Sequence, residues 1–426
     1  MALASARLQS AAEPVLSGAH WAPPMQTFIV GHAAHPDWGR ALALATAQIE
    51  GQRSRPNADL AEASLGFVYF SDHYAAHATP LLDSLRQRWP GVAWVGTVAV
   101  GVAASGVEYF DEPALVLMLA ALPVGRFQVF SGARPLARIE AHTALVHADG
   151  NTPDLPELID DMSARTTSGY LFGGISSART APCQIAEGVL HGGLSGVAFS
   201  RDVALVSRVT QGCQPVGPVR RITACERNVV TALDGEPALA CLLRDTGISL
   251  DAPQQAMNTL RGTLVGLSEA RDALLARTGQ FGVDTRVRHL IGLDPARQGV
   301  AVADMLEPGM HLAFCQRDVL AARRDLVRIC AEIRDELTPE PVASVVTHGV
   351  DEPFTPLDAT ARIAGAIYIS CAGRGGPHFG APSAELQIVQ RALGNVPLVG
   401  FFAGGEIGHH HLYGYTGVLT VFVRGA

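Results

Sequence analysis

Apolar runs and polar loops alternate regularly toward the C-terminal end of the chain. An apolar run covers 363–369, and a glycine-rich loop follows at 372–380. Apolar side chains then recur at helical spacing over 386–393. Two further apolar runs cover 396–402 and 416–423. This order predicts a strand, a helix and two more strands, in which the first two strands are parallel and joined by a right-handed crossover.

The same pattern of apolar runs, helix starts and turns occurs twice earlier in the chain. The three segments that agree are 65–121, 143–199 and 363–423. In each of them, the second apolar run breaks at a glycine before a turn of small residues. These glycines are Gly96, Gly173 and Gly400. We predict one strand–helix–strand–strand unit used three times, in an α/β protein with mixed sheets. The alternative is coincidence among short apolar runs in a chain rich in alanine and glycine.

The region between the second and third segments has a different pattern. Strands and hairpins are expected over 203–233, and helices at 237–244, 263–277 and 317–337. The last of these has its apolar residues on one side, which is typical of an amphipathic helix.

The candidate chemistry lies in the two loops that follow the first and second strands of the last segment. Because the carboxyl ends of parallel strands meet at one edge of a sheet, and ligands of open α/β sheets bind there, these loops should line one pocket. The residues expected in this pocket are Cys371, Arg374, Gly375, Gly376, His378, Gly404, Gly405, Glu406, His409, His410 and His411.

Among these residues, Cys371 is the strongest single candidate for a reactive side chain. A cysteine at a strand end, beside backbone N–H groups and Arg374, should have a lowered pKa. Glu406 or a histidine would then serve as its base, which makes Cys371 the candidate nucleophile of a hydrolase or transferase. Redox sensing without catalysis and simple packing are the alternatives, since buried inert cysteines are common.

Arg374 has two interpretations. Its guanidinium, together with free amides before a helix, suits a carboxylate or phosphate ligand. Alternatively, Arg374 pairs with Glu406 and holds the two loops together, and a ligand would displace the glutamate. The neighbouring glycines allow close backbone approach but do not follow the dinucleotide-binding spacing.

The histidines are candidate ligands of haem iron or of another metal ion. They are His378 and the consecutive residues His409, His410 and His411. Successive residues of a strand point to opposite faces, so at most two of the consecutive three can share one ion. Exposed histidines without a ligand role are the alternative.

Composition narrows the class of protein. All 32 basic residues are arginine, so Schiff-base and pyridoxal phosphate enzymes, P-loop NTPases and protein kinases, which need a lysine, are excluded. A net charge of -8 without a basic block argues against a nucleic-acid partner. The seven scattered cysteines lack a CxxC pair, and no signal peptide or membrane span is evident. We expect a cytoplasmic protein with no membrane partner.

Several short sequences, taken together in this order and at this spacing, are specific for one protein family. They are Gly96 with Gly101, Phe172-Gly-Gly-Ile-Ser, Gly193-Leu-Ser-Gly-Val-Ala, Gln211-Gly-Cys-Gln-Pro-Val-Gly-Pro, Cys371-Ala-Gly-Arg, Gly400-Phe-Phe-Ala-Gly-Gly-Glu-Ile-Gly and Thr416-Gly-Val-Leu-Thr-Val. On these residues the chain resembles a FIST protein, in which an N-terminal FIST domain is joined to a C-terminal one. We place these two domains at 27–230 and 231–426, after a loose tail at 1–26.

The resemblance implies a sensory module that binds small ligands, with amino acids among the suggestions. Some stand-alone bacterial members are regarded as haem-containing nitric oxide sensors that act on a histidine kinase or a cyclic-nucleotide enzyme. Haem is therefore a candidate cofactor. No kinase or cyclase sequence follows Ala426, so we expect output through a separate partner protein. The alternative function is a cysteine-dependent hydrolase or transferase that uses Cys371. The sequence identifies neither the ligand nor the partner nor the oligomeric state.

Overall fold

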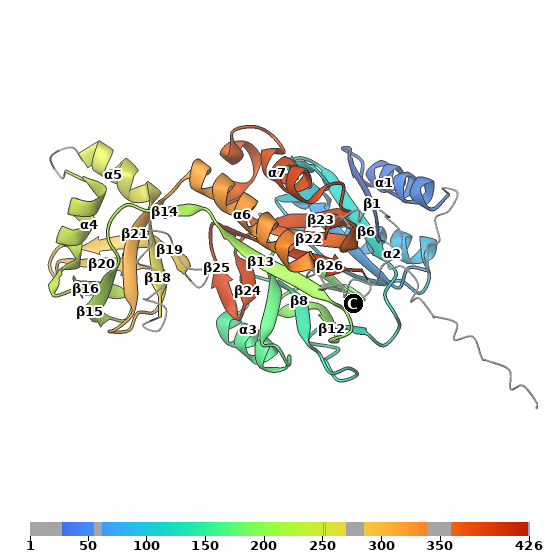
Figure 1. Cartoon of the computed structure of the whole chain (residues 1–426), viewed down its shortest axis with the longest axis horizontal. Coiled ribbons are helices and arrows are strands. Elements are labelled where there is room, and N and C mark those ends of the chain that lie inside the picture. Colours follow the sequence, from blue (N-terminus) through green and yellow to red (C-terminus); the bar gives the residue numbers. More distant parts are fainter. Residues whose placement is uncertain are drawn as a thin grey trace, which may run out of the picture.

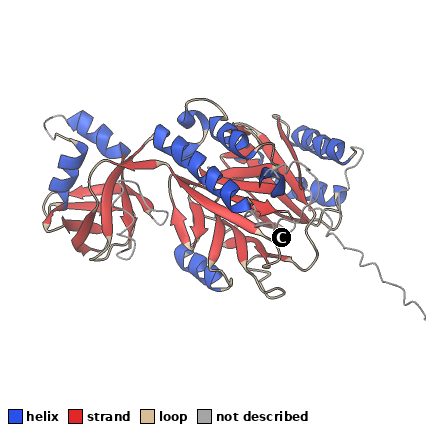
Figure 2. Ribbon diagram, viewed as in Figure 1, coloured by secondary structure: helices blue, strands red, loops and turns tan. Residues whose placement is uncertain are grey.

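The computed structural model describes residues 28–54, 62–249, 251, 253–269, 285–338 and 359–424. A large body of three mixed sheets carries helices on its outside, and a smaller part built on an eight-stranded sheet lies at one end of it (Figure 1, Figure 2). The predicted α/β class is confirmed. None of the described helices combines the length and the apolar character that a membrane crossing requires.

Each sheet of the body has six strands. In spatial order, the first sheet contains β1 (Phe28–Ala34), β6 (Ala114–Ala120), β2 (Leu65–Ser71), β3 (Ala93–Ala99), β10 (Gln184–Ala186) and β11 (Val189–Leu190). The second contains β7 (Phe127–Phe130), β12 (Leu194–Phe199), β8 (Thr143–Ala148), β9 (Tyr170–Ile175), β24 (Glu406–His409) and β25 (His411–Tyr413). The third contains β13 (Leu205–Gln211), β26 (Thr416–Val423), β22 (Ile363–Cys371), β23 (Leu398–Ala403), β4 (Gly101–Ala104) and β5 (Val107–Phe110).

The three segments predicted to be repeats follow one path. In each, the first strand pairs in parallel with the second and antiparallel with the third. These sets are β2 with β3 and β6, β8 with β9 and β12, and β22 with β23 and β26. The helices between the first and second strands are α2 (Ala78–Arg88), α3 (Leu155–Ala164) and α7 (Ala384–Leu393). The predicted repeat is therefore confirmed.

A glycine at one equivalent position of each unit allows the first two strands to approach closely. A Cβ atom at Gly96 would lie 1.7 Å from the carbonyl oxygen of Val68. At Gly173 it would lie 1.9 Å from that of Val146, and at Gly400 1.7 Å from that of Tyr368. Any side chain at these positions would overlap a backbone atom, so the glycines seen in the sequence are a steric requirement of the fold.

In each unit, one hairpin pairs with a strand in the sheet of another unit. The hairpin β4–β5 of the first unit pairs with β23 of the third, and β10–β11 of the second pairs with β3 of the first. The hairpin β24–β25 of the third unit pairs with β9 of the second, which closes the cycle. The sequence pattern did not predict this exchange.

Side chains from all three sheets meet in one core inside the body, with Phe67, Phe172 and Phe401 as examples from the three units. The outer faces are covered by α1 (Trp38–Arg53), α2, α3, α6 (Val319–Leu337) and α7. In the common core, the hydroxyl group of Tyr69 lies 3.2 Å from Nε2 of His147, and both side chains are fully buried.

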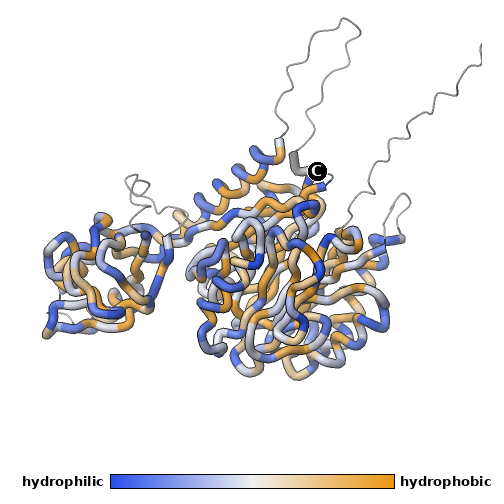
Figure 3. The backbone as a smooth tube through the Cα atoms, turned by 90° about the horizontal axis from the view of Figure 1, so that it is seen from below, coloured by the Kyte–Doolittle hydropathy of each residue, from blue (hydrophilic) through white to orange (hydrophobic). Residues whose placement is uncertain are grey.

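The smaller part is inserted between β13 and α6, and we call it the inserted barrel. Its strands are β14 (Cys213–Pro215), β15 (Arg220–Glu226), β16 (Val229–Leu233), β17 (Glu236–Pro237), β18 (Thr263–Ser268), β19 (Arg286–Asp294), β20 (Gly299–Val302) and β21 (His311–Arg317). Antiparallel pairings close a ring in the order β15, β16, β20, β19, β18 and β21. Its helices are α4 (Ala238–Thr246) and α5 (Pro253–Gly262). Figure 3 shows the barrel and the body from below.

The helix predicted at 263–277, within the inserted barrel, is wrong over Thr263–Ser268. This segment forms β18 because its residues pair with both β19 and β21, and most of the rest of the range lies outside the described residues. The domain division at residue 230 stays a prediction, although β13 and β26, from either side of it, pair in one sheet. The N-terminal tail also lies outside the described residues.

Candidate functional site

The two loops predicted to meet do so where β22 and β23 end. Cys371 is the last residue of β22 and is in register with Ala403, the last residue of β23. Two short 3₁₀ turns follow Cys371, η4 (Ala372–Arg374) and η5 (Gly376–Phe379). The thiol of Cys371 lies beside the carboxyl group of Glu406, at the start of β24. The juxtaposition of these two loops is therefore confirmed.

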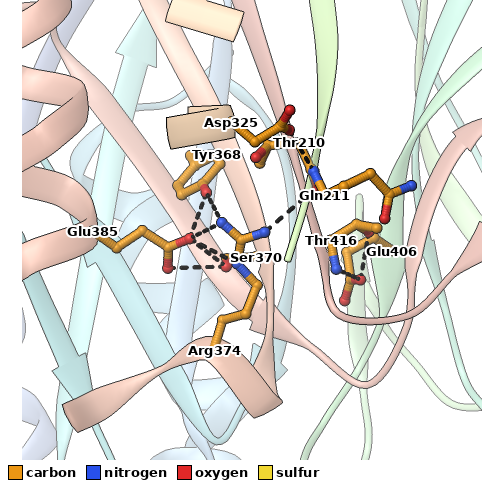
Figure 4. A network of polar contacts seen from close by, with 9 residues as sticks. All are labelled: Thr210, Gln211, Asp325, Tyr368, Ser370, Arg374, Glu385, Glu406 and Thr416. Carbon is orange, nitrogen blue, oxygen red and sulfur yellow. Dashed lines mark hydrogen bonds and ion pairs between the residues drawn. The ribbon is translucent and has the colours of Figure 1, made fainter. Parts of the chain in front are cut away.

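Arg374 is a buried member of an ion pair (Figure 4). Its Nη2 and Nε donate to Oε1 of Glu385 over 2.7 and 3.0 Å. Glu385 also accepts from the hydroxyl groups of Tyr368 (2.6 Å) and Ser370 (3.0 Å). The prediction that Arg374 pairs with Glu406 is thus wrong. The carboxylate that pairs with the guanidinium is that of Glu385, from the first turn of α7. A ligand could contact Arg374 only by displacing Glu385.

Glu406 is completely buried, and its carboxyl group lies beside Thr416 (Figure 4). Burial is the main cause that raises the pKa of its carboxyl group to about 8, although Thr416 donates to Oε2 from its backbone N–H (3.1 Å) and its hydroxyl (2.7 Å). Among the described residues, Oε1 has no aligned hydrogen-bond partner. At neutral pH this side chain is mostly protonated.

The expected lowering of the pKa of Cys371 is wrong. Burial, and next the negative charge of Glu406, raise the pKa of this thiol to about 12, and the backbone N–H groups of Gly373 and Tyr415 offset this only in part. The thiol is therefore protonated at neutral pH. At neutral pH only the deprotonated fraction of Glu406 could accept the proton of Cys371. The raised pKa of Cys371 therefore gives no support to a reactive thiolate at neutral pH.

The glycines that were expected to bind a ligand have structural reasons of their own in these loops. A Cβ atom at Gly375 would lie 2.1 Å from the ring of Phe110, which fills the space beside it. Gly376 has a φ of +68°, a conformation that favours glycine. The backbones of Gly404 and Gly405 pair with Ile175 over 2.9 and 2.8 Å. No close approach to a ligand is needed to account for these glycines.

The four candidate haem ligands lie in two separate places. His378 is in η5, where burial and the charge of Arg374 lower its pKa. The hairpin β24–β25 runs back along β9, so that His409 is in register with Leu171 and Glu406 with Gly174, three residues further along β9. The hairpin thus leads away from Glu406 toward the consecutive histidines, and their place in the pocket of Cys371 stays a prediction.

The consecutive histidines do not gather with other metal-binding side chains among the described residues. His410 is exposed, and burial is the main cause that lowers the pKa of His411 to about 4. Arg286 and Arg288 also lie near His411, and both pair with Asp304. The part of the chain that the structure describes holds no cluster of three or more metal-binding side chains.

Sequence reasoning missed the contact between the body and the inserted barrel at Tyr415. Its hydroxyl group lies 2.9 Å from Nε2 of His289 and accepts from Arg317, whose guanidinium carbon lies 3.8 Å from the centre of the Tyr415 ring. We call this contact the Tyr415 seam. The buried residues that pack together there are Cys213, Leu264, Val287, Cys315, Cys371 and Tyr415. Two residues in the sequence could have indicated this contact. They are Tyr415 and Arg317, which lies just before α6, because an arginine side chain can pack on an aromatic ring.

Comparisons with known proteins agree with this architecture. The family model for the FIST N domain matches residues 64–236, and that for the FIST C domain matches residues 238–409. An uncharacterized protein of Mycobacterium tuberculosis is 28% identical over 413 residues, which cover 92% of this chain and 99% of the relative. An uncharacterized protein of Mycobacterium bovis is 29% identical over 380 residues, which cover 84% of this chain and 90% of the relative. The chain belongs to the FIST family, whose domains are generally sensory modules that bind small ligands in signal transduction.

Proposed function

We propose that this protein is a sensor that binds a small anion at the Tyr415 seam and signals through a separate partner protein. The observation that carries the proposal is the contact of Tyr415, from the body, with His289 and Arg317, from the inserted barrel, directly beside the Cys371 loop. A ligand that competes for these contacts would change how the barrel is held against the body. Such a change is a signal that a partner protein can read.

The charges around the seam favour an anion. Arg317 is exposed and, among the described residues, has no carboxylate partner. His378 lies near both Arg374 and Arg317. The carboxyl group of Glu406, with a pKa of about 8, is mostly neutral at pH 7 and offsets little of this positive charge. An arginine fork without a carboxylate partner binds carboxylates and phosphates well.

The two connections between barrel and body offer a route for the signal. The backbone N–H of Asp318 donates to the carbonyl oxygen of Gly212 over 3.1 Å, so the chain enters and leaves the barrel at one place. Arg317 immediately precedes Asp318, and Cys213 immediately follows Gly212. A ligand on Arg317 would therefore act on both connections at once.

Calorimetric titrations with L-glutamate, acetate and inorganic phosphate test the proposal. We expect at least one of these anions to bind saturably, and Arg317→Ala to weaken its binding by about tenfold or more. Arg391→Ala is the matched control, because Arg391 is an exposed arginine on α7. Binding that is equal in the wild type and in Arg317→Ala would refute the site.

Hydrogen exchange, measured with and without the bound anion, tests the signalling step. Amides in 212–215 and 311–318 should change their exchange rates when the anion binds. Saturable binding without any change in these segments would refute transmission through the barrel, even if the site itself is correct.

A further inference from the structure

A hollow of about 390 Å³ lies at the opposite edge of the body from Cys371. It opens between the second and third sheets, where Thr143 and Tyr170 begin β8 and β9. Cys371, in contrast, ends β22. The size of the hollow falls in the range of about 300–1,000 Å³ that small-molecule sites have. It is therefore separate from the Tyr415 seam and large enough for a ligand.

Two arginines among the lining residues leave positive charge at this hollow. Arg201 is exposed and has no hydrogen-bond or carboxylate partner among the described residues. The guanidinium of Arg362 donates to one acceptor in that part of the chain, the carbonyl oxygen of Leu337, over 3.0 Å. The one acidic lining residue, Glu336, is engaged by Arg208. Because Arg208 already pairs with Glu336, Arg201 and Arg362 leave positive charge for an anionic head group.

Apolar residues form part of the inner wall of the hollow. Among them Leu205 is partly exposed, whereas Phe172 and Val423 are almost completely buried. The hydroxyl groups on the same wall are already satisfied, since Tyr170 donates to Ser207 over 2.7 Å and Ser207 lies 2.7 Å from the hydroxyl of Thr420. The wall therefore offers an apolar tail a surface with few open hydrogen-bonding groups.

We propose that this hollow binds an amphipathic monocarboxylate, with its carboxylate on Arg201 and Arg362 and its apolar tail against Leu205 and the apolar lining residues beside it. The charge-assisted contact to an arginine fixes the head group. Burial of the tail adds about 0.8 kcal/mol for each CH₂ group removed from water. This site goes beyond the proposed function, because it uses neither Arg317 nor Tyr415.

Head-group and tail comparisons on the unmodified protein provide the first test. Octanoate should bind saturably in a calorimetric titration. Acetate lacks the tail, 1-octanol lacks the charge and octylammonium carries the opposite charge, so each should bind at least about tenfold more weakly. If octanoate does not bind, or if 1-octanol binds as tightly as octanoate, the proposal is wrong.

Variants then locate the site. Arg201→Ala should weaken octanoate binding by about tenfold or more without affecting the fold, because Arg201 makes no described contact, and Arg201→Lys should restore part of the affinity. Leu205→Trp should fill the hollow and abolish binding. Arg391→Ala should leave binding unchanged. If octanoate bound Arg201→Ala and Leu205→Trp as it binds the wild type, it would be bound elsewhere and the site would be refuted, whatever the fate of the Tyr415 seam.

Discussion

Arg374 and Glu385 are only eleven residues apart in sequence and form an ion pair of 2.7 Å in which both side chains are 1% exposed. The pair joins the loop after β22 to the first turn of α7, the helix that leads to β23. A loop and a helix of one repeat unit are thus held together by a buried ion pair. The ligand role first expected of Arg374 requires this pair to open.

Removing one partner of this pair should destabilise the protein severely. Arg374→Ala leaves the Glu385 carboxylate buried and unpaired, which typically costs about 3–5 kcal/mol. Urea denaturation monitored by circular dichroism measures the loss. The control is Arg244→Ala, which breaks the exposed pair of Arg244 with Glu236 and should cost about 1 kcal/mol or less. A loss below about 1 kcal/mol for Arg374→Ala would mean that Glu385 finds another partner or is hydrated.

Acidification should destabilise the body through His147. Burial lowers the pKa of His147 to about 3, against about 6.5 in an unfolded chain. Protons therefore bind the unfolded chain first, and this contribution to stability is complete above pH 6.5 and falls between pH 6.5 and pH 3 by up to roughly 1.4 kcal/mol per pH unit.

The variant His147→Gln tests this pH dependence. Glutamine keeps a polar group near Tyr69 but cannot titrate, so the free energy of unfolding should fall less steeply below pH 6.5 than in the wild type. His191→Gln, at an exposed histidine, should keep the wild-type slope. Parallel slopes for wild type and His147→Gln would show that other groups cause the acid sensitivity.

Cys371 should be unreactive in the folded protein. Its thiol has a pKa of about 12 and is buried, so alkylation by iodoacetamide at pH 8 should be at least about a hundredfold slower than that of an unhindered thiol. Peptide mass spectrometry over time measures this rate, with the partly exposed Cys225 as the internal comparison and urea-unfolded protein as the positive control. Rapid labelling of Cys371 in the native state would restore it as a candidate nucleophile.

Gly400→Ala should prevent the third unit from forming its native strand pair. The new Cβ atom would lie 1.7 Å from the carbonyl oxygen of Tyr368, and a backbone atom in the middle of a sheet cannot move aside cheaply. We expect a loss of about 3 kcal/mol or more, or no soluble protein. Gly51→Ala is the matched control, since nothing lies within 4 Å of that position in α1. Equal stability of the two variants would contradict the steric account of the repeated glycines.

The repeat could be predicted from sequence because its determinants are local. Apolar runs mark the strands, and the glycines at 96, 173 and 400 mark the positions where neighbouring strands leave no room for a side chain. The partner of each hairpin could not be predicted in this way. Short strands such as β10 and β24 do not encode which distant edge they join.

The chemistry at Cys371 was misjudged for a related reason. The charges near a strand end can be estimated from sequence, but the degree of burial cannot, and burial decides the pKa values of Cys371 and Glu406. The loop arrangement at the sheet edge was predicted, whereas the ion pair of Arg374 and the contact at Tyr415 depend on how α7 and the inserted barrel pack.

The cyclic exchange of hairpins has a consequence for how the gene can be divided. A polypeptide that ended near residue 237, where the two family regions meet, would keep β9 without its neighbour β24 and would present β4–β5 with no sheet to join. Open strand edges of this kind recruit other chains, so we expect such a half to form swapped dimers or aggregates. The two halves should instead assemble when they are synthesised together as separate chains, because each carries the strand that completes the other.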